Sequence, residues 1–172
     1  MLIERTSAPA MRSLIKDFVM LLQDAIAGGA SVGFIAPLHT EEAEAYWTKV
    51  IREVENNERI VIVALEGNVL AGCVHIVPAT TQNGKHRAEI QKMLVHSRFR
   101  RRGLGRSLLA TAEHSAREMG KTLLILDTER NSPGEALYTA AGWERSGVIS
   151  GFATDASGKQ LIDTVIFFKL LK

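Results

Sequence analysis

The chain has few of the residues that cross-link a small protein or hold a metal. It contains 172 residues with one cysteine, Cys73, so no internal disulfide can form. Cys73 lies in an apolar run typical of a strand, which predicts a buried, inert thiol. The histidines follow no metal-ligand spacing, so we expect no metal site. A chain of this length buries a core without such supports, and we expect one domain over residues 1–172.

Excess charge and long apolar runs are also missing. There are 21 basic and 19 acidic residues, which gives a net charge of +2. This balance argues against a general polyanion binder, so we expect no nucleic acid partner. No apolar stretch has the length of a bilayer span, and no signal peptide pattern is present. We therefore expect a cytoplasmic protein without a membrane partner.

The hydrophobic pattern predicts strands and helices that alternate along the chain, which indicates an α/β fold on a mixed sheet. Helical periodicity predicts four helices, at residues 10–27, 40–57, 103–119 and 133–141. Strand patterns with turn signals between them occur at residues 2–6, 59–66, 69–78, 87–96, 123–126, 143–149 and 160–169. Residues 30–38 are expected to form a loop.

The most informative segment is the basic turn Arg100-x-x-Gly103-x-Gly105, between a strand pattern and a helix pattern. The first N–H groups of a helix have no intrahelical partner and lie at the positive end of its dipole. The glycines lack a Cβ, so a ligand can approach that backbone closely. Five arginines lie in or beside the turn with no acidic neighbour in the sequence: Arg98, Arg100, Arg101, Arg102 and Arg106. The turn therefore predicts a polyphosphate site.

This turn, followed by an apolar strand, Asn131 and a short helix with Tyr138, resembles the GNAT superfamily of acetyl-CoA-dependent N-acetyltransferases. The resemblance is closest to the tabtoxin-resistance branch, whose members acetylate the amino group of a β-lactam amino-acid toxin. It is carried by the segments Gly28-Gly-Ala-Ser-Val-Gly-Phe34, Arg87-Ala-Glu-Ile-Gln-Lys92, Arg102-Gly-Leu-Gly-Arg106 and Leu126-Asp-Thr-Glu129. Ser150-Gly151-Phe152 departs from the Pro-Gly-Tyr-like segment expected there.

The resemblance implies a single-domain GNAT fold with a mixed, mostly antiparallel sheet of about seven strands and about four flanking helices. It also implies acetyl-CoA as cofactor, CoA as product, and a small primary amine as acceptor. An amino-acid-like β-lactam is one candidate acceptor. Last strands in this superfamily often pair between subunits, so a homodimer is a further expectation.

The proton of the attacking amine needs an acceptor, and two carboxylates are candidates. Asp127 ends an apolar strand, where ligands bind in open α/β sheets. Glu89 lies on the strand before the basic turn. The resemblance points to the same pair. The alternatives are a salt bridge from Glu89 to Arg87 or Lys92, and an Asp127 that caps a turn.

The remaining site residues are assigned from position and from the resemblance. Tyr138 is the candidate proton donor to the leaving thiolate, with packing against the Trp143 strand as its alternative. The cofactor candidates are Met93, Leu94, Val95, Arg100, Arg101, Arg102, Gly103, Leu104, Gly105, Arg106, Ser107, Asn131, Pro133 and Tyr138. The substrate candidates are Phe34, Tyr46, Glu129 and Phe152. Phe34, Tyr46 and Trp47 could together form an aromatic wall for the substrate, but packing of the helix and the loop explains these three residues at least as well.

Two other functions compete with acetylation of a small amine. Acetylation of a peptide or protein predicts an open groove, whereas the loop at residues 28–38 favours a covered pocket. A non-catalytic phosphate or nucleic-acid binding module would leave Glu89, Asp127 and Tyr138 without a role. A P-loop nucleotide hydrolase is excluded because no Lys-Ser/Thr follows the glycine turn.

Overall fold

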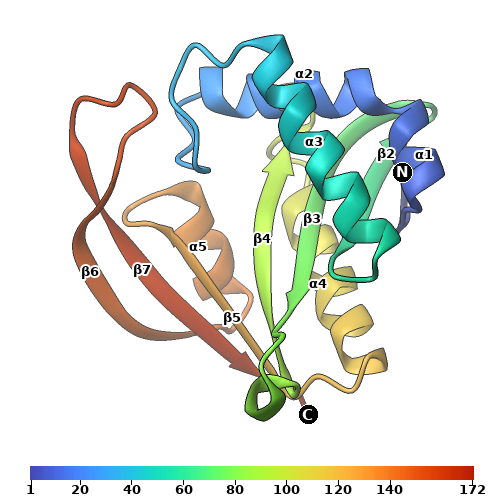
Figure 1. The fold of residues 1–172 in the computed structure, drawn as a ribbon. Helices are drawn as coiled ribbons and strands as arrows, with labels where there is room; N and C mark the ends of the chain where they lie inside the picture. Colours follow the sequence, from blue (N-terminus) through green and yellow to red (C-terminus); the bar gives the residue numbers. More distant parts are fainter.

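A single seven-stranded sheet organises the computed structural model, which describes residues 1–172 (Figure 1). The strands lie in the order β1-β2-β3-β4-β5-β7-β6, and only β4 and β5 are parallel neighbours. The predicted mixed, mostly antiparallel sheet is confirmed. The bounds are β1 (Leu2–Arg5), β2 (Ile60–Glu66), β3 (Val69–Pro78), β4 (Arg87–Val95), β5 (Leu123–Glu129), β6 (Glu144–Thr154) and β7 (Leu161–Leu170).

The helices cover both faces of the sheet (Figure 1). Their bounds are α1 (Ala8–Ser13), α2 (Ile15–Ala27), α3 (Thr40–Glu55), α4 (Leu104–Glu118) and α5 (Pro133–Ala140). The single helix predicted at residues 10–27 was wrong in one respect, because the chain bends at Leu14, with φ −102° and ψ 14°, and forms α1 and α2. Ser7 caps α1 by accepting a hydrogen bond from the Ala10 N–H. None of the helices combines the length and hydropathy that a bilayer span requires.

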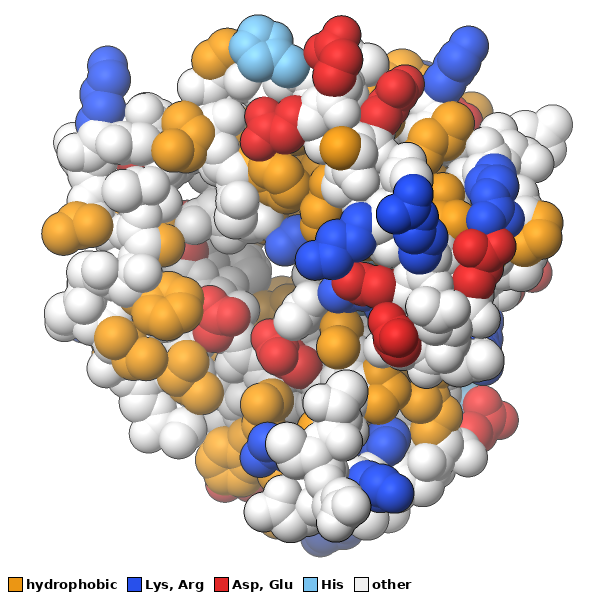
Figure 2. Space-filling view, in the orientation of Figure 1, with side chains coloured by type: hydrophobic (Ala, Val, Ile, Leu, Met, Phe, Trp, Pro, Cys, Tyr) orange, Lys and Arg blue, Asp and Glu red, His pale blue; other side chains and the backbone are white.

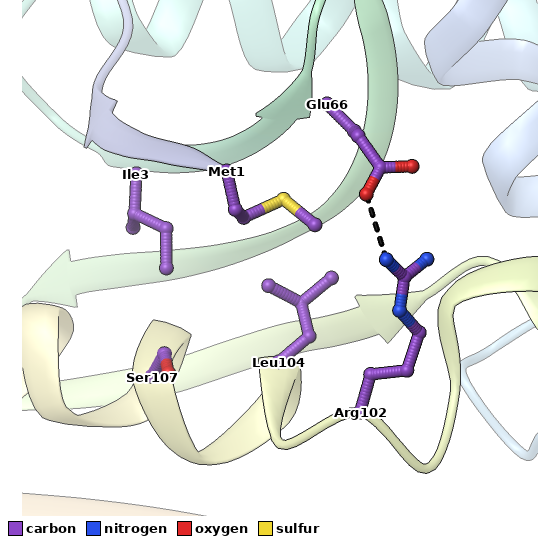
Figure 3. A pocket seen from close by; sticks show the side chains of 6 residues that line it. All are labelled: Met1, Ile3, Glu66, Arg102, Leu104 and Ser107. Atoms are coloured by element: carbon purple, nitrogen blue, oxygen red, sulfur yellow. Dashed lines mark hydrogen bonds and ion pairs between the residues drawn. The ribbon is translucent and has the colours of Figure 1, made fainter.

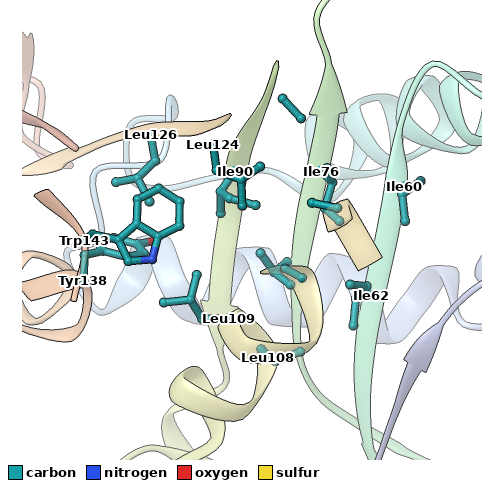
Figure 4. Packing of buried hydrophobic residues seen from close by; sticks show 14 of the residues in the cluster. Ile60, Ile62, Ile76, Ile90, Leu108, Leu109, Leu124, Leu126, Tyr138 and Trp143 are labelled. Atoms are coloured by element: carbon teal, nitrogen blue, oxygen red, sulfur yellow. The ribbon is translucent and has the colours of Figure 1, made fainter. Parts of the chain in front are cut away.

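Two apolar cores lie on the two faces of the sheet. One face packs against α4 and α5, with Leu108, Leu109 and Trp143 over the central strands (Figure 4). The other face packs against α1, α2 and α3, where Phe18 and Trp47 are fully buried. Burying both faces of β2 and β3 explains why these strands are nearly continuous apolar runs.

Two strands run further than the sequence pattern predicted. The strand predicted at residues 123–126 continues to Glu129, because β5 pairs with β7 as far as Glu129 and Thr164. The strand predicted at residues 143–149 continues to Thr154 as β6, with a register shift between Ile149 and Ala153. Pairing with β7 in both cases holds polar residues in extended conformation, and a local pattern does not contain that partner.

The sheet opens between its two parallel strands. Pairing of β4 with β5 covers only three positions, from Arg87 and Leu123 to Glu89 and Ile125. Beyond them the two strands diverge (Figure 1). The register of β4 with β3 also shifts between Cys73 and His75, and Lys92 in this bulge has φ 48°. The carboxyl-terminal half of β4 therefore has a strand neighbour on one side only.

Candidate active site

The basic turn lies where the sequence predicted it, at the start of α4. Gly103 is the N-cap residue in a left-handed conformation with φ 78°, and no side chain caps the helix. The first backbone bond of α4 runs from the Ser107 N–H to the Gly103 carbonyl, at 3.1 Å. The N–H groups of the first turn before Ser107 are therefore unsatisfied by the helix. A Cβ on Gly103 would have no atom within 4 Å, so the space in front of this turn is open.

The arginines of the turn are less free than the sequence indicated. Arg102 pairs with Glu66 of β2 at 2.8 Å, beside a shallow pocket of about 400 Å³ (Figure 3). Arg100 lies 3.7 Å from Asp24 of α2. The turn has no acidic neighbour in the sequence, and the fold brings Glu66 and Asp24 to it from distant parts of the chain. Arg98, Arg101 and Arg106 are exposed and form no ion pair.

Asp24 ties α2 to the segment that leads into the turn. Its carboxylate accepts hydrogen bonds from the Ser97 N–H at 2.8 Å and the Ser97 hydroxyl at 2.6 Å. Partial burial raises the pKa of Asp24, but the two Ser97 bonds and the charges of His96 and Arg100 outweigh it, so the pKa is lowered. An ionised Asp24 therefore holds the segment before the turn in place.

The free side of β4 presents backbone groups at Met93, Leu94 and Val95. Because pairing with β5 ends at Glu89, this edge is available to an extended, amide-containing ligand that adds as a strand would. The Val95 carbonyl already accepts a hydrogen bond from Arg100 Nε at 3.0 Å. Leu94 is buried in the core beside α2 and α3, so only its backbone can contact a ligand. The open turn and this free edge together fit a cofactor with a diphosphate and an amide-containing arm.

Glu89 and Asp127 lie on one face of the sheet at the opening. Glu89 is in register with Ile125, and alternation along β5 puts residues 125, 127 and 129 on the same side. Asp127 is exposed and accepts a hydrogen bond from the Thr164 hydroxyl at 2.9 Å. This hydrogen bond fixes one carboxylate oxygen towards β7.

Glu89 is half-buried and forms no hydrogen bond and no ion pair. The alternative of a salt bridge to Arg87 or Lys92 is therefore not observed. Glu129 lies further along the same face, and burial together with the charge of Asp155 raises its pKa. The face thus carries three carboxylates along the opening, with Glu89 free of partners.

Tyr138 faces the apolar core with its ring. It is 5% exposed and packs on Trp143 and Phe167, with ring centroids 5.9 and 6.0 Å apart. Burial, followed by the charge of Asp127, raises its pKa, so the hydroxyl keeps its proton at neutral pH. The packing alternative is observed, and the charge of Asp127 acts on the hydroxyl without a hydrogen bond between them.

The segment before α5 has the conformation of a helix start. Asn131 is exposed with φ 61°, and its N–H donates to the Glu135 carboxylate at 2.5 Å. Pro133 occupies the first turn, and the Ser132 hydroxyl caps the helix by accepting from the Glu135 N–H at 3.2 Å. Both Asn131 and Pro133 are exposed at the carboxyl end of β5, where the opening is widest.

The aromatic candidates divide between the site and the core. Phe34 and Tyr46 are half-buried and pack edge to face, with ring centroids 5.3 Å apart. Trp47 is fully buried under them and is a core residue. Phe152 is 53% exposed on the edge strand β6, and no aromatic contact joins it to Phe34 or Tyr46. The aromatic wall near the opening therefore consists of Phe34 and Tyr46.

The loop at residues 28–38 bridges the opening to the β6–β7 turn. The Ala36 N–H donates to the Ala156 carbonyl at 2.7 Å. Ile35 lies against Gly158, where a Cβ would stand 3.2 Å from Ile35 Cδ1. Figure 2 shows the surface hollowed between the β6–β7 arm and the rest of the molecule, with acidic and basic side chains around the hollow. The bridge therefore closes one side of this hollow.

The sequence pattern of the "Acetyltransferase (GNAT) family" matches residues 17–143 of this chain. The chain is also 32% identical over 124 residues to the "Uncharacterized N-acetyltransferase in hisH-hisA intergenic region" of Azospirillum brasilense, which covers 69% of this chain and 72% of that protein. The family match, at residues 17–143, extends over more than half of the chain, and this range contains the turn, Glu89, Asp127 and Tyr138. The chain belongs to the GNAT family and is an acetyl-CoA-dependent N-acetyltransferase.

Solved structures agree with this fold. A ribosomal-protein-alanine N-acetyltransferase from Brucella melitensis has a TM-score of 0.78 at 22% identity, over 99% of this chain and 100% of that one. The protein yncA from Salmonella typhimurium, solved with its cofactor acetyl-CoA, has a TM-score of 0.78 at 17% identity, over 100% and 94% of the two chains. At these identities the likeness shows the fold alone.

Three features of the site were missed by the sequence reasoning. The bulge at Lys92 leaves no local signal, because nothing in the sequence marks where the register with β3 changes. The Asp24–Ser97 bond joins residues 73 positions apart. The contact of Ala36 with Ala156 joins two loops, and only the glycine-rich composition of residues 28–33 indicated that the first one is irregular.

Proposed function

We propose that this enzyme acetylates the primary amine of a small, amino-acid-like molecule by direct attack of the amine on the thioester. The observation that carries this proposal is the bridge from the loop at residues 28–38 to the β6–β7 turn, through Ala36 and Ala156 at 2.7 Å. A covered hollow favours an acceptor of limited size. The aromatic pair Phe34 and Tyr46 supplies an apolar wall for such a molecule.

In the proposed reaction Glu89 and Asp127 handle the proton of the amine. A lysine-like amine has a pKa near ~10.4 and is mostly protonated at neutral pH, so an acceptor for its proton is needed. Glu89 has both carboxylate oxygens free of partners, whereas Asp127 keeps one oxygen bonded to Thr164. Glu89 is therefore our candidate base, and Asp127 orients the amine or relays its proton. A well-placed base contributes about 10²–10⁴ in rate.

Other residues hold the cofactor and complete the proton transfer. Acetyl-CoA supplies the activated acyl carbon. The backbone of residues 101–106 with Ser107 is proposed to bind its phosphates, and Met93 to Val95 to bind its amide-containing arm. Asn131 and Pro133 lie where that arm would leave the opening. The Tyr138 hydroxyl, kept protonated by burial, donates its proton to the departing sulfur.

The more specific acceptor is an amino acid that carries a β-lactam ring. Support for it comes from four segments that resemble the tabtoxin-resistance branch, including residues 28–34 and 87–92. Phe152 is exposed on β6. We therefore expect the departure at Ser150-Gly151-Phe152 to leave Glu89 and Asp127 unaffected. The two carboxylates and the covered hollow suit this acceptor as well as a simple amino acid.

Acetylation of a protein is the competing activity, and the name of the Brucella melitensis structure describes such an enzyme. That structure shares 22% identity with this chain, so the likeness does not identify the acceptor of this enzyme. The contact of Ile35 with Gly158 closes the direction in which an extended peptide would pass. The bridge therefore favours the small acceptor.

Thiol release from acetyl-CoA against a panel of acceptors tests the proposal. The panel contains amino acids, polyamines, aminoglycosides, β-lactam amino acids and peptides that begin with alanine. We expect turnover with amino acids or β-lactam amino acids and at least tenfold lower kcat/KM for the peptides. Turnover of peptides alone, or tight acetyl-CoA binding without any small acceptor, would contradict the small-amine proposal.

A further inference from the structure

Lys92 is a cation directed into the site by the bulge of β4. Its φ of 48° takes the side chain out of the alternation of the strand. Its Nζ lies 5.6 Å from the centroid of the Tyr46 ring. On the opposite side, a Cβ on Gly33 would stand 3.8 Å from the same nitrogen. Lys92 Nζ thus lies between α3 and the loop that bridges the hollow.

The ammonium group of Lys92 has no counter-ion in direct contact. The side chain is half-buried, and no carboxylate lies within ion-pair distance and no acceptor within hydrogen-bond distance of Nζ. Of the other half-buried cations, Lys169 and Arg59 are paired with carboxylates, and Lys121 donates to the Lys85 carbonyl at 2.6 Å. Lys169 Nζ contacts both oxygens of Glu113 at 2.8 Å, and Arg59 Nε contacts Glu53 at 2.5 Å.

A half-buried cation without a counter-ion destabilises the folded protein, and the contact of Lys92 with the Tyr46 ring does not offset this cost. A cation over an aromatic ring gains less than a buried charge without a counter-ion loses. Burial, followed by the charge of Arg59, lowers the pKa of Lys92, and the charges of Asp127 and Glu89 oppose this only in part. The long-range field of the two acids helps to keep the ammonium charged without pairing it.

Charge in the hollow is therefore separated. Glu89, Asp127 and Glu129 form an acidic row on the β4 and β5 side of the opening, and Lys92 is an unpaired cation beside Tyr46 and Gly33. An acceptor with an amine at one end meets the row. A negative group a few bonds from that amine would meet Lys92 and supply the counter-ion that the chain does not.

We propose that Lys92 Nζ, beside Tyr46 and Gly33, binds a carboxylate of the acceptor, so that the substrates are amino acids or molecules with a carboxylate close to the acetylated amine. This inference rests on the proposed function, since it names the chemical group that accompanies the amine. Lys92 is then a specificity-determining residue: it selects the acceptor through its anionic group, while Glu89 and Asp127 act on the amine.

The test compares acids with their amides in wild type and in two variants. Alanine, leucine and lysine are each paired with their carboxamide, and kcat/KM is measured for wild type, Lys92→Met and Lys92→Arg. The acid-to-amide ratio is then compared between proteins, which cancels the difference in amine reactivity within each pair. Lys49→Met is the matched control, because Lys49 is an exposed lysine of α3 with 76% of its side chain accessible.

We expect Lys92→Met to lower the acid-to-amide ratio by about 10- to 100-fold, mainly through KM, because one hydrogen bond to a charged group is lost. Lys92→Arg keeps the charge and should retain most of the ratio if it folds as wild type. Lys49→Met should leave it unchanged. Equal losses for acid and amide in Lys92→Met would assign Lys92 a structural role and overturn the inference.

Calorimetry separates this inference from the proposed function. The same acids and amides are titrated into the complex of the enzyme with CoA, where no acetyl transfer occurs. Tighter binding of the acids that is lost in Lys92→Met supports the carboxylate site even if no amino acid is acetylated, a result that would overturn only the proposed function. Acetylation with an unchanged ratio would overturn only the inference. Failure of every carboxylate to bind the complex also overturns it.

Discussion

Replacing Gly105 by alanine should stabilise the protein and weaken its hold on acetyl-CoA. Gly105 is the second residue of α4 and has no left-handed φ. A Cβ there would stand 3.4 Å from Leu137 Cδ2 and 3.9 Å from Val95 Cγ2, which are ordinary contacts. Alanine in place of glycine stabilises a helix interior by about 0.5–1 kcal/mol. In the first turn we expect about 0.5 kcal/mol, a rise in Tm of about 1–2 °C.

We expect the same methyl group to hinder the close approach of a phosphate to this backbone. Each hydrogen bond to a charged group contributes about 1.5–3 kcal/mol, so the loss of one weakens binding about 10- to 100-fold. Acetyl-CoA affinity is measured by calorimetry and the free energy of unfolding by urea denaturation. Ala110→Gly is the control, since Ala110 is exposed on the same helix. It should lose up to about 1 kcal/mol of stability and bind acetyl-CoA like wild type.

The reasoning is refuted if Gly105→Ala binds acetyl-CoA with unchanged affinity. In that case the phosphates do not lie against this part of the turn. A destabilised Gly105→Ala would show instead that Leu137 cannot accommodate the methyl group. The two outcomes are independent, because one is read from binding and the other from unfolding.

Three further perturbations have definite expectations. Glu113→Ala removes the carboxylate to which Lys169 Nζ and the Trp143 indole N–H donate at 2.8 Å, so the indole N–H loses its partner and Lys169 keeps only the Ala141 carbonyl. Urea denaturation should show a loss of about 3 kcal/mol, and a loss below about 1 kcal/mol would show that these bonds do not stabilise the core. Burial lowers the pKa of His75 well below its usual 6.5, so the unfolded chain binds a proton that the folded chain does not, and stability falls as pH drops below about 6.5 by up to about 1.4 kcal/mol per unit. His75→Asn should remove that part of the slope between about pH 6.5 and 5, and an unchanged slope would contradict it. Asp24→Asn should raise the acetyl-CoA Kd about 3- to 10-fold by weakening the hydrogen bonds to Ser97. An unchanged Kd would show that these hydrogen bonds do not affect the cofactor site.

The fold was largely predictable because its local signals are strong. The strand-to-helix turn at Gly103, the capped start of the first helix and the apolar runs of β2 and β3 all follow from residue pattern. Features that depend on a distant partner were not predictable. The extension of β5 to Glu129 needs β7, and the bend at Leu14 interrupts a continuous helical period.

The candidate site divides in the same way. The turn and the choice of Glu89 and Asp127 follow from motif, strand position and the family resemblance, whereas their shared face depends on the register of β4 with β5. The pairing of Arg102 with Glu66 and the direction of Lys92 depend on tertiary neighbours, which a single sequence does not reveal. Local composition indicated a basic turn free of acids, and the folded chain brings Glu66 and Asp24 to it.

The central claim is that Glu89 and Asp127 act on the acceptor amine while the glycine turn holds the cofactor. First-turnover rates of wild type, Glu89→Gln and Asp127→Asn, measured with saturating acetyl-CoA and the best acceptor of the panel, test it most directly. The account predicts a rate about 10²–10⁴ lower in at least one variant, with acetyl-CoA affinity by calorimetry within about twofold of wild type in both. Unchanged rates in both variants would contradict it.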